Sequence, residues 1–156
     1  MKINDKVAFI TGGSGGLGSV IALRLAASGA NIAISYGQNL AAAKEIKAQI
    51  IAMGRKCCIL EMDQRVPQSI VNSVNHIVSE LGTIDILVNN AAWNAAVPFK
   101  DLDALTPELW DRMHETNLRG PFLVTRACAS HLRKNKMGRV INCLLYTSEL
   151  PTTDRV

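Results

Sequence analysis

The feature that most constrains this chain is a run of small residues that follows a short apolar segment near the N-terminus. The apolar segment Val7 to Ile10 leads directly into TGGSGGLGSV, after which Leu17, Ile21 and Leu25 recur at helical spacing. A strand, a glycine-rich turn and a helix in this order let backbone amides approach a phosphate closely, and the helix dipole stabilises its charge. We therefore predict a diphosphate-binding loop at residues 11–18.

Two glycine patterns fit this loop. The pattern GxGxxG is matched by Gly13, Gly15 and Gly18, and the pattern TGxxxGxG is matched by Thr11, Gly12, Gly16 and Gly18. Because loop, helix and a second strand follow in the expected order, the context favours dinucleotide binding over a turn that serves packing alone. The triphosphate-binding pattern GxxxxGK[ST] is excluded, since Ser19 occupies its lysine position.

The rest of the chain alternates short β-branched runs with helical patterns, which predicts an α/β fold with a parallel sheet. Strands are expected at residues 7–10, 32–35, 57–60, 84–88 and 139–142. A helix is expected from Pro67 to Gly82, with its apolar stripe at Ile70, Val74, Ile77, Val78 and Leu81.

A long helix is expected from Thr106, with Pro107 in its first turn, to about Lys134. Pro121 falls inside it and has no N–H to donate to the carbonyl four residues back. In an α-helix that carbonyl belongs to Asn117. We therefore expect an interruption near Asn117, with a backbone carbonyl free for other partners.

The end of the second expected strand bears on the choice of nucleotide. In dinucleotide-binding domains an acid there binds the adenosine ribose and repels a 2′-phosphate. Residues 35–39 are Ser, Tyr, Gly, Gln and Asn, with no carboxylate. This favours NADP(H) over NAD(H), and it also counts against an S-adenosylmethionine methyltransferase.

Composition excludes several other classes of protein. The chain has 156 residues, 48% of them hydrophobic, enough for one domain with a core, and no apolar run approaches the roughly 20 residues of a membrane span. Its N-terminal residues lack the pattern of a secretory signal, so we expect a cytoplasmic protein without membrane attachment. The formal net charge of +4 comes from one basic cluster at residues 126–139, which suits a helix C-terminus better than nucleic acid.

Cysteine and histidine spacing predicts neither a disulfide framework nor a metal site. Four cysteines stand at positions 57, 58, 128 and 143 without a CxxC pair, and the three histidines form no HExxH motif. We expect the cysteines to be reduced thiols.

Taken together, five ordered motifs resemble the short-chain dehydrogenase/reductase family. They are TGxxxGxG at 11–18, Asp63 after the third strand, IDILVNNAA at 84–92, Asn117 within ETNLRGPF, and GRVIN at 138–142. The resemblance implies a Rossmann-type doubly wound parallel sheet with helices on both faces and an NAD(P)-binding domain over residues 1–142. It also implies hydride transfer between an alcohol and a carbonyl compound.

The resemblance assigns roles residue by residue. Contacts to the cofactor would come from Gly12, Ser14, Gly16, Leu17 and Gly18 at the diphosphate, Tyr36 near the adenosine ribose, Asp63 and Gln64 at the adenine, and Asn90, Ala91 and Ala92 at the nicotinamide-side ribose. Ala92 stands where the family usually has glycine. Asn117 corresponds to the catalytic asparagine, whose main-chain carbonyl holds a water in a proton relay. Asn89 is expected only to tie adjacent segments together.

The resemblance ends after GRVIN. Leu145 stands where the family has serine, and the family's tyrosine, followed four positions later by lysine, is absent: Tyr36 is followed by Leu40 and Tyr146 by Leu150. That pair delivers the proton during hydride transfer. We therefore interpret the chain as an inactive portion of an enzyme that lacks the C-terminal strands, with residues 143–156 a tail outside the family pattern produced by a truncated reading frame.

Two interpretations of function stay open. In the first, the chain is part of an oxidoreductase that acts on a small alcohol or carbonyl substrate and forms a homo-oligomer at full length. In the second, it is a short protein that binds NADP(H) without turning it over.

Overall fold

The computed structural model describes residues 3–98, 100–134 and 136–143. In chain order, the elements are β1 (Val7–Ile10), α1 (Gly16–Ala27), β2 (Asn31–Tyr36), α2 (Leu40–Ala52), β3 (Cys57–Glu61), α3 (Pro67–Leu81), β4 (Ile86–Asn89), the short 3₁₀ helix η1 (Leu102–Ala104), α4 (Pro107–His114), the π-helical segment η2 (Glu115–Arg119), α5 (Gly120–Lys134) and β5 (Arg139–Asn142).

The strands form one parallel sheet in the order β3-β2-β1-β4-β5. The chain therefore leaves β1 toward one side through β2 and β3 and returns to the other side through β4 and β5, which confirms the predicted doubly wound sheet. Between β1 and β4 the winding reverses. In open α/β sheets, ligands bind at the carboxyl ends of the strands beside such a reversal.

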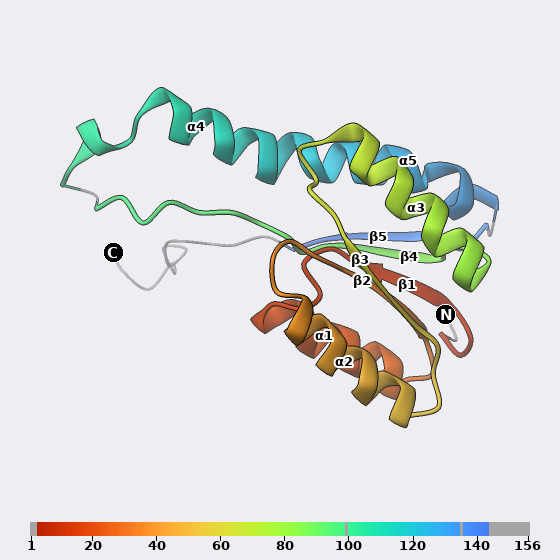
Figure 1. The fold of residues 1–156 in the computed structure, drawn as a ribbon. Coiled ribbons are helices and arrows are strands. Elements are labelled where there is room, and N and C mark those ends of the chain that lie inside the picture. The colour runs from red at the N-terminus through yellow and green to blue at the C-terminus, as the bar shows by residue number, and fades with distance from the viewer. Residues whose placement is uncertain (1–2, 99, 135, 144–156) are drawn as a thin grey trace, which may run out of the picture.

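Helices cover both faces of the sheet, as predicted (Figure 1). On one face, α3 and α5 pack over side chains such as Phe9, Leu87 and Leu60. On the other, α1 and α2 pack over side chains such as Ile10 and Ile34. Strands buried on both faces explain why β1 and β4 read as continuous apolar runs rather than alternating ones.

The predicted strands are confirmed with small shifts at their ends. The largest shift is in β4, which begins at Ile86 rather than at residue 84. Asp85 explains the later start, because its carboxylate accepts a hydrogen bond from the backbone N–H of Val7 at 2.9 Å. The residue before β4 thus serves as a side-chain tie to β1.

Helix α1 buries a different stripe from the one that its leucines indicate. Its buried residues are Gly18, Ala22 and Ala26, whereas Leu17 is 56% exposed. Small side chains on the inner face let the helix axis approach the sheet closely, which brings its N-terminus to the glycine loop. Ile21 and Leu25 pack only at the border of this core.

The long helix predicted from Thr106 is divided by a π-helical segment. The Thr106 hydroxyl accepts the N–H of Leu109, so the predicted cap is confirmed. In η2 the N–H of Gly120 donates to the carbonyl of Glu115, five residues back. In that register the carbonyl that Pro121 leaves without a helical donor belongs to Thr116 and not to Asn117, because the π-helical turn contains one residue more.

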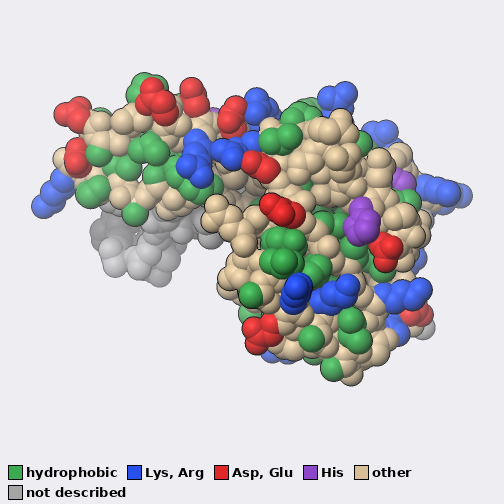
Figure 2. All heavy atoms as spheres, in the orientation of Figure 1, with side chains coloured by type: hydrophobic (Ala, Val, Ile, Leu, Met, Phe, Trp, Pro, Cys, Tyr) green, Lys and Arg blue, Asp and Glu red, His purple; other side chains and the backbone are tan. Residues whose placement is uncertain are grey.

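Basic side chains gather at the end of the molecule where α5 ends (Figure 2). The last turn of α5 contains His131, Arg133 and Lys134. Cations there face the negative end of the helix dipole, as the sequence indicates. Within the described residues, no helix is both long and apolar enough to cross a membrane.

Candidate functional site

The glycine loop leaves β1 and turns into the first turn of α1. Gly12 has a φ of +64°, and a Cβ there would lie 3.0 Å from the Cα of Ala91. A Cβ on Gly18 would lie 2.3 Å from the Gly12 carbonyl oxygen and 2.6 Å from Nδ2 of Asn90. Glycine at both positions is therefore required for the loop to pack against the turn after β4.

Gly16 differs from these two glycines because a Cβ there would meet no protein atom within 4 Å. It is exposed at the N-terminus of α1 and lines a cavity of about 850 Å³. Helix α1 begins at this residue, and its cap residue Gly15 has no side chain to bond the free amides. Open backbone and unpaired donors at a helix start fit an anionic group such as a diphosphate.

Thr11 and Asn90 hold the loop and the turn together. The Thr11 hydroxyl oxygen accepts the backbone N–H groups of Asn90 and Ala91 at 3.0 and 2.9 Å. In return, the Asn90 amide donates to the carbonyl oxygens of Thr11 and Gly12 at 2.9 and 3.2 Å. Both amide donors of Asn90 are thus used within the protein, and its side chain builds the shape of the cavity.

The cavity lies at the carboxyl edge of the sheet and collects most of the residues predicted from the sequence. All eleven predicted cofactor contacts line it: Gly12, Ser14, Gly16, Leu17, Gly18, Tyr36, Asp63, Gln64, Asn90, Ala91 and Ala92. Its size falls within the range of about 300–1,000 Å³ typical of ligand pockets. The structure thus brings together residues at or just beyond the carboxyl ends of β1, β2, β3 and β4.

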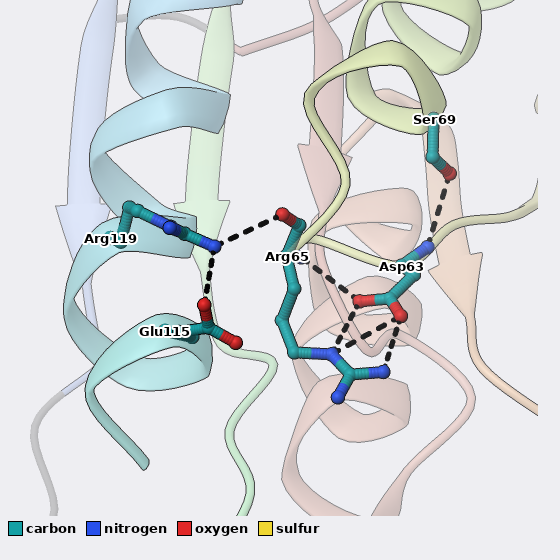
Figure 3. A network of polar contacts seen from close by, with 5 residues as sticks. All are labelled: Asp63, Arg65, Ser69, Glu115 and Arg119. Carbon is teal, nitrogen blue, oxygen red and sulfur yellow. Dashed lines mark hydrogen bonds and ion pairs between the residues drawn. The ribbon is translucent and has the colours of Figure 1, made fainter. Parts of the chain in front are cut away.

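Asp63 lies beside a cation that the sequence analysis did not consider. Arg65 donates from Nε and Nη2 to the two carboxylate oxygens of Asp63, the shortest contact being 2.6 Å (Figure 3). The backbone N–H of Asp63 in turn donates to the Ser69 hydroxyl at 3.1 Å. The hydrogen bonds from Arg65 hold the pKa of the Asp63 carboxyl below its ordinary value.

The ion pair between Asp63 and Arg65 predicts how folding stability depends on pH. Because the pKa of Asp63 is lowered in the folded state, its contribution to stability is present above the unfolded-state pKa and is lost as pH falls through the folded-state value. Replacing Arg65 with glutamine should raise the pKa of Asp63 toward 3.8. Carboxyl ¹³C chemical shifts followed through an acid titration measure this. The surface variant Arg24→Gln is the control, and an unchanged Asp63 pKa in Arg65→Gln would contradict the assigned cause.

Asn117 lies on η2 and binds the segment that follows β4. Its side chain donates from Nδ2 to the Trp93 carbonyl at 2.7 Å and accepts the Trp93 N–H at 2.8 Å. The guanidinium of Arg112 lies 4.2 Å from the centre of the Trp93 ring, and both residues line the cavity. Asn117 itself does not line the cavity, but its side chain holds Trp93, which does.

Asn89 ties adjacent elements together, as expected. Its amide donates to the Thr125 hydroxyl at 3.1 Å and to Oδ1 of Asn142 at 2.8 Å. It therefore joins β4 to α5 and β5. Its own Oδ1 is buried without a hydrogen-bond partner.

Several cavity residues were missed by sequence reasoning. They are the lining residues Glu61, Arg65, Trp93, Arg112, Thr116 and Cys143. Ser35 belongs to the segment already considered for the nucleotide, and its hydroxyl accepts the Gly12 N–H at 3.2 Å. Glu61 could have been found, since it ends β3 as Tyr36 ends β2, and the two residues are paired in register. No local pattern marks Arg65 or Arg112. Leu145, Tyr146 and the tail residues 144–156 lie outside the described residues.

All four cysteines lie in the described part of the chain and are free thiols. Burial raises the pKa of Cys57 and of Cys128 to about 12, which favours the protonated thiol over the thiolate at both positions. Over residues 3–98, 100–134 and 136–143, no cluster of three His, Cys, Asp or Glu side chains is arranged to hold a metal ion.

The family model described as short chain dehydrogenase matches residues 6–151. The chain belongs to this family. The short-chain dehydrogenase/reductase FrzI of Cladobotryum sp is 38% identical over 131 residues, which are 82% of this chain and 48% of FrzI. The chain thus spans about half the length of the curated relatives it matches.

Solved structures of the family have the same fold. A short chain dehydrogenase from Burkholderia cenocepacia in complex with NADP has a TM-score of 0.82 and 35% identity, covering 91% of this chain and 56% of its own. An NAD⁺-bound xylitol dehydrogenase has a TM-score of 0.81 and 29% identity, with coverage of 91% and 54%. The family and its fold thus agree with the motifs in the sequence.

Proposed function

We propose that this chain is the nucleotide-binding part of an NAD(P)-dependent oxidoreductase that interconverts a small alcohol and a carbonyl compound. The observation that carries this proposal is the cavity at the switch point of the sheet. It is lined by the glycine loop, Asp63 and the turn at residues 90–92. Family membership supports the same reaction class. A bound nicotinamide nucleotide supplies the hydride donor or acceptor.

Different residues of the cavity would bind different parts of the cofactor. The open backbone at Gly16 and the free amides at the start of α1 would hold the diphosphate. Asp63, kept as a carboxylate by Arg65, would accept a hydrogen bond from the adenine amine. Ala91, whose N–H is bound by Thr11, and the following Ala92 would lie under the nicotinamide-side ribose. Asn117 would be the catalytic asparagine, placed beside the cavity by the two hydrogen bonds of its side chain to the backbone of Trp93.

NADP(H) is the proposed cofactor, because residues 35–39 contain no carboxylate to repel a 2′-phosphate. The NADP complex of the Burkholderia relative supports this preference, and the NAD⁺ complex of the xylitol dehydrogenase supports the alternative. The carboxylate of Glu61 counts against NADP(H), because Glu61 lines the same cavity and is paired with Tyr36 in the sheet register.

Replacing Tyr36 with aspartate tests the proposal. A carboxylate there should weaken NADPH binding by at least about tenfold through repulsion of the 2′-phosphate, with little effect on NADH. Dissociation constants for both nucleotides, from titration calorimetry, measure the change. Tyr36→Asn is the uncharged control and should leave the NADPH-to-NADH ratio within about twofold. Glu61→Gln should move the ratio toward NADPH. Failure of the wild-type chain to bind either nucleotide would overturn the proposed function.

A second candidate function rests on a specific feature of the sequence. The chain contains no tyrosine followed four positions later by lysine, so we propose that it does not turn the nucleotide over by itself. A module that binds NADP(H) without reaction has the same cavity. Turnover by the chain alone would exclude this candidate.

Self-association is proposed for the full-length enzyme. The helical rod formed by α4, η2 and α5 exposes large apolar side chains, Trp110 at 52%, Leu118 at 67% and Phe122 at 61%. Exposed apolar side chains of this size favour an interface.

A further inference from the structure

A buried glutamine connects three segments of the site. Gln64 is 5% exposed and lies next to Asp63, in the segment that follows the end of β3 at Glu61. Its Nε2 donates to the Thr116 carbonyl at 2.7 Å and to the Ala91 carbonyl at 3.0 Å. One side-chain amide therefore joins the end of β3, the turn after β4 and the π-helical segment η2.

The hydrogen bond to Thr116 compensates for a donor that the helix lacks. The N–H of Gly120 donates five residues back to Glu115, and in this register the next donor would be residue 121. Because residue 121 is proline, the Thr116 carbonyl has no donor within the helix. Gln64 supplies that donor from β3, across 52 positions of sequence. Leaving a partly buried carbonyl without a partner is costly.

The packing around Gln64 is matched to this role. A Cβ on Gly120 would lie 2.8 Å from Cγ of Gln64 and 3.0 Å from its Cδ. The absence of a side chain at residue 120 therefore makes room for the glutamine. Gly120, the first residue of α5, thus makes room for Gln64. Gln64 in turn supplies the hydrogen-bond donor that Pro121, the second residue of α5, lacks.

The two carbonyls that Gln64 binds belong to different parts of the site. Thr116 precedes Asn117, which holds the backbone of Trp93 through two hydrogen bonds. Ala91 belongs to the turn that Thr11 ties to the glycine loop. The side chain of Gln64 therefore determines how far η2 lies from the nicotinamide-side turn.

We propose that Gln64 is a positioning residue, which sets the spacing between η2 and the turn at residues 90–92 and so shapes the nicotinamide end of the cavity. The inference rests on the proposed function for its ligand. It differs from a direct adenine contact, because both donors of the Gln64 amide are used on the protein. Replacing Gln64 should therefore weaken binding of the nicotinamide half of the nucleotide, which lies at the opposite end from the adenine proposed to bind Asp63.

Comparing a ligand that contains the nicotinamide half with one that lacks it distinguishes a positioning role of Gln64 from a general effect on stability. In the full 156-residue chain, Gln64→Met keeps the length of the side chain and removes both donors. NADPH affinity should fall about tenfold, whereas affinity for adenosine 2′,5′-bisphosphate, which lacks the nicotinamide half, should fall less than about twofold. The matched control is Gln68→Met, since Gln68 is exposed on α3 and bonds only Asn72. Equal losses for both ligands, or no loss for NADPH, would overturn the proposal.

Amide exchange tests the coupling without any ligand. Gln64→Met should lower the protection of the Trp93 and Gly120 amides about tenfold, relative to intrinsic rates. In Gln64→Glu, the ionised carboxyl cannot donate, whereas its protonated form donates one hydrogen bond. Protection of these two amides in Gln64→Glu should therefore rise as pH falls, while the wild type stays flat. A flat profile in Gln64→Glu would contradict the assigned role.

These measurements separate the two proposals. If the wild-type chain binds no nucleotide while the exchange results hold, the proposed function fails and the positioning role of Gln64 stands. If nucleotide binds and the exchange pattern is absent, only the inference about Gln64 fails. Should Gln64→Met not fold, Gly120→Ala applies the same test, because its Cβ displaces the Gln64 side chain.

Discussion

Replacing Gly18 with alanine is expected to weaken NADPH binding roughly a hundredfold and to destabilise the fold. The new Cβ would lie 2.3 Å from the Gly12 carbonyl oxygen and 2.6 Å from the Asn90 amide nitrogen. The glycine loop and the turn after β4 would have to separate, and overpacking of this kind costs about 1–3 kcal/mol. The upper end of that range corresponds to the hundredfold loss. Urea unfolding and calorimetry with NADPH measure both effects.

Gly16→Ala is the matched control within the same loop. A Cβ there meets no protein atom within 4 Å, so folding stability should stay within about 0.5 kcal/mol of the wild type. Since Gly16 lines the cavity, the added methyl would occupy space proposed for the diphosphate. We expect a loss of NADPH affinity without a loss of stability. Unchanged NADPH affinity in Gly16→Ala would contradict the proposal that the diphosphate binds at this loop.

Joining this chain to a family C-terminal half is expected to produce turnover. The 156-residue chain should show no reduction of carbonyl compounds with NADPH, because loss of general acid catalysis alone costs about 10² to 10⁴ in rate. A chimera joined after Asn142 to the corresponding half of a family member that has the tyrosine and lysine would supply this pair. NADPH oxidation against a panel of small aldehydes and ketones measures the gain.

Two variants of the chimera identify what restores the reaction. Changing the supplied tyrosine to phenylalanine should return the rate to that of the chain alone. Asn117→Ala should also lower the rate, since the Asn117 side chain holds Trp93 and η2 in place. Ordinary turnover by the chain alone, or by the phenylalanine variant, would contradict the proposed role of the missing pair.

Local patterns were sufficient for the strands, the helices and the glycine loop. The order of strand, loop and helix at residues 7–27 predicted the anion site, because hydrogen bonding within a turn and periodicity along a helix depend on near neighbours. The same was true of the Thr106 cap, which needs only the third residue after it. The missing carboxylate at residues 35–39 was equally visible.

Contacts between distant segments could not be predicted in this way. The α-helical rule assigned the freed carbonyl to Asn117, and the π-helical register assigns it to Thr116. Nothing near Gln64 in sequence indicates that its donors reach residues 27 and 52 positions away. Likewise, the pairing of Tyr36 with Glu61 follows from sheet register alone.

The sequence by itself determined the class of fold, the glycine loop and the absence of the tyrosine and lysine pair, since each depends on residue type and local spacing. Only the tertiary structure decided which polar groups bond one another within the cavity. The physical reason is that buried donors and acceptors must be paired, and the available partners depend on how the strands and helices pack. Gln64, Asn90 and Arg65 all obtained their partners in this way.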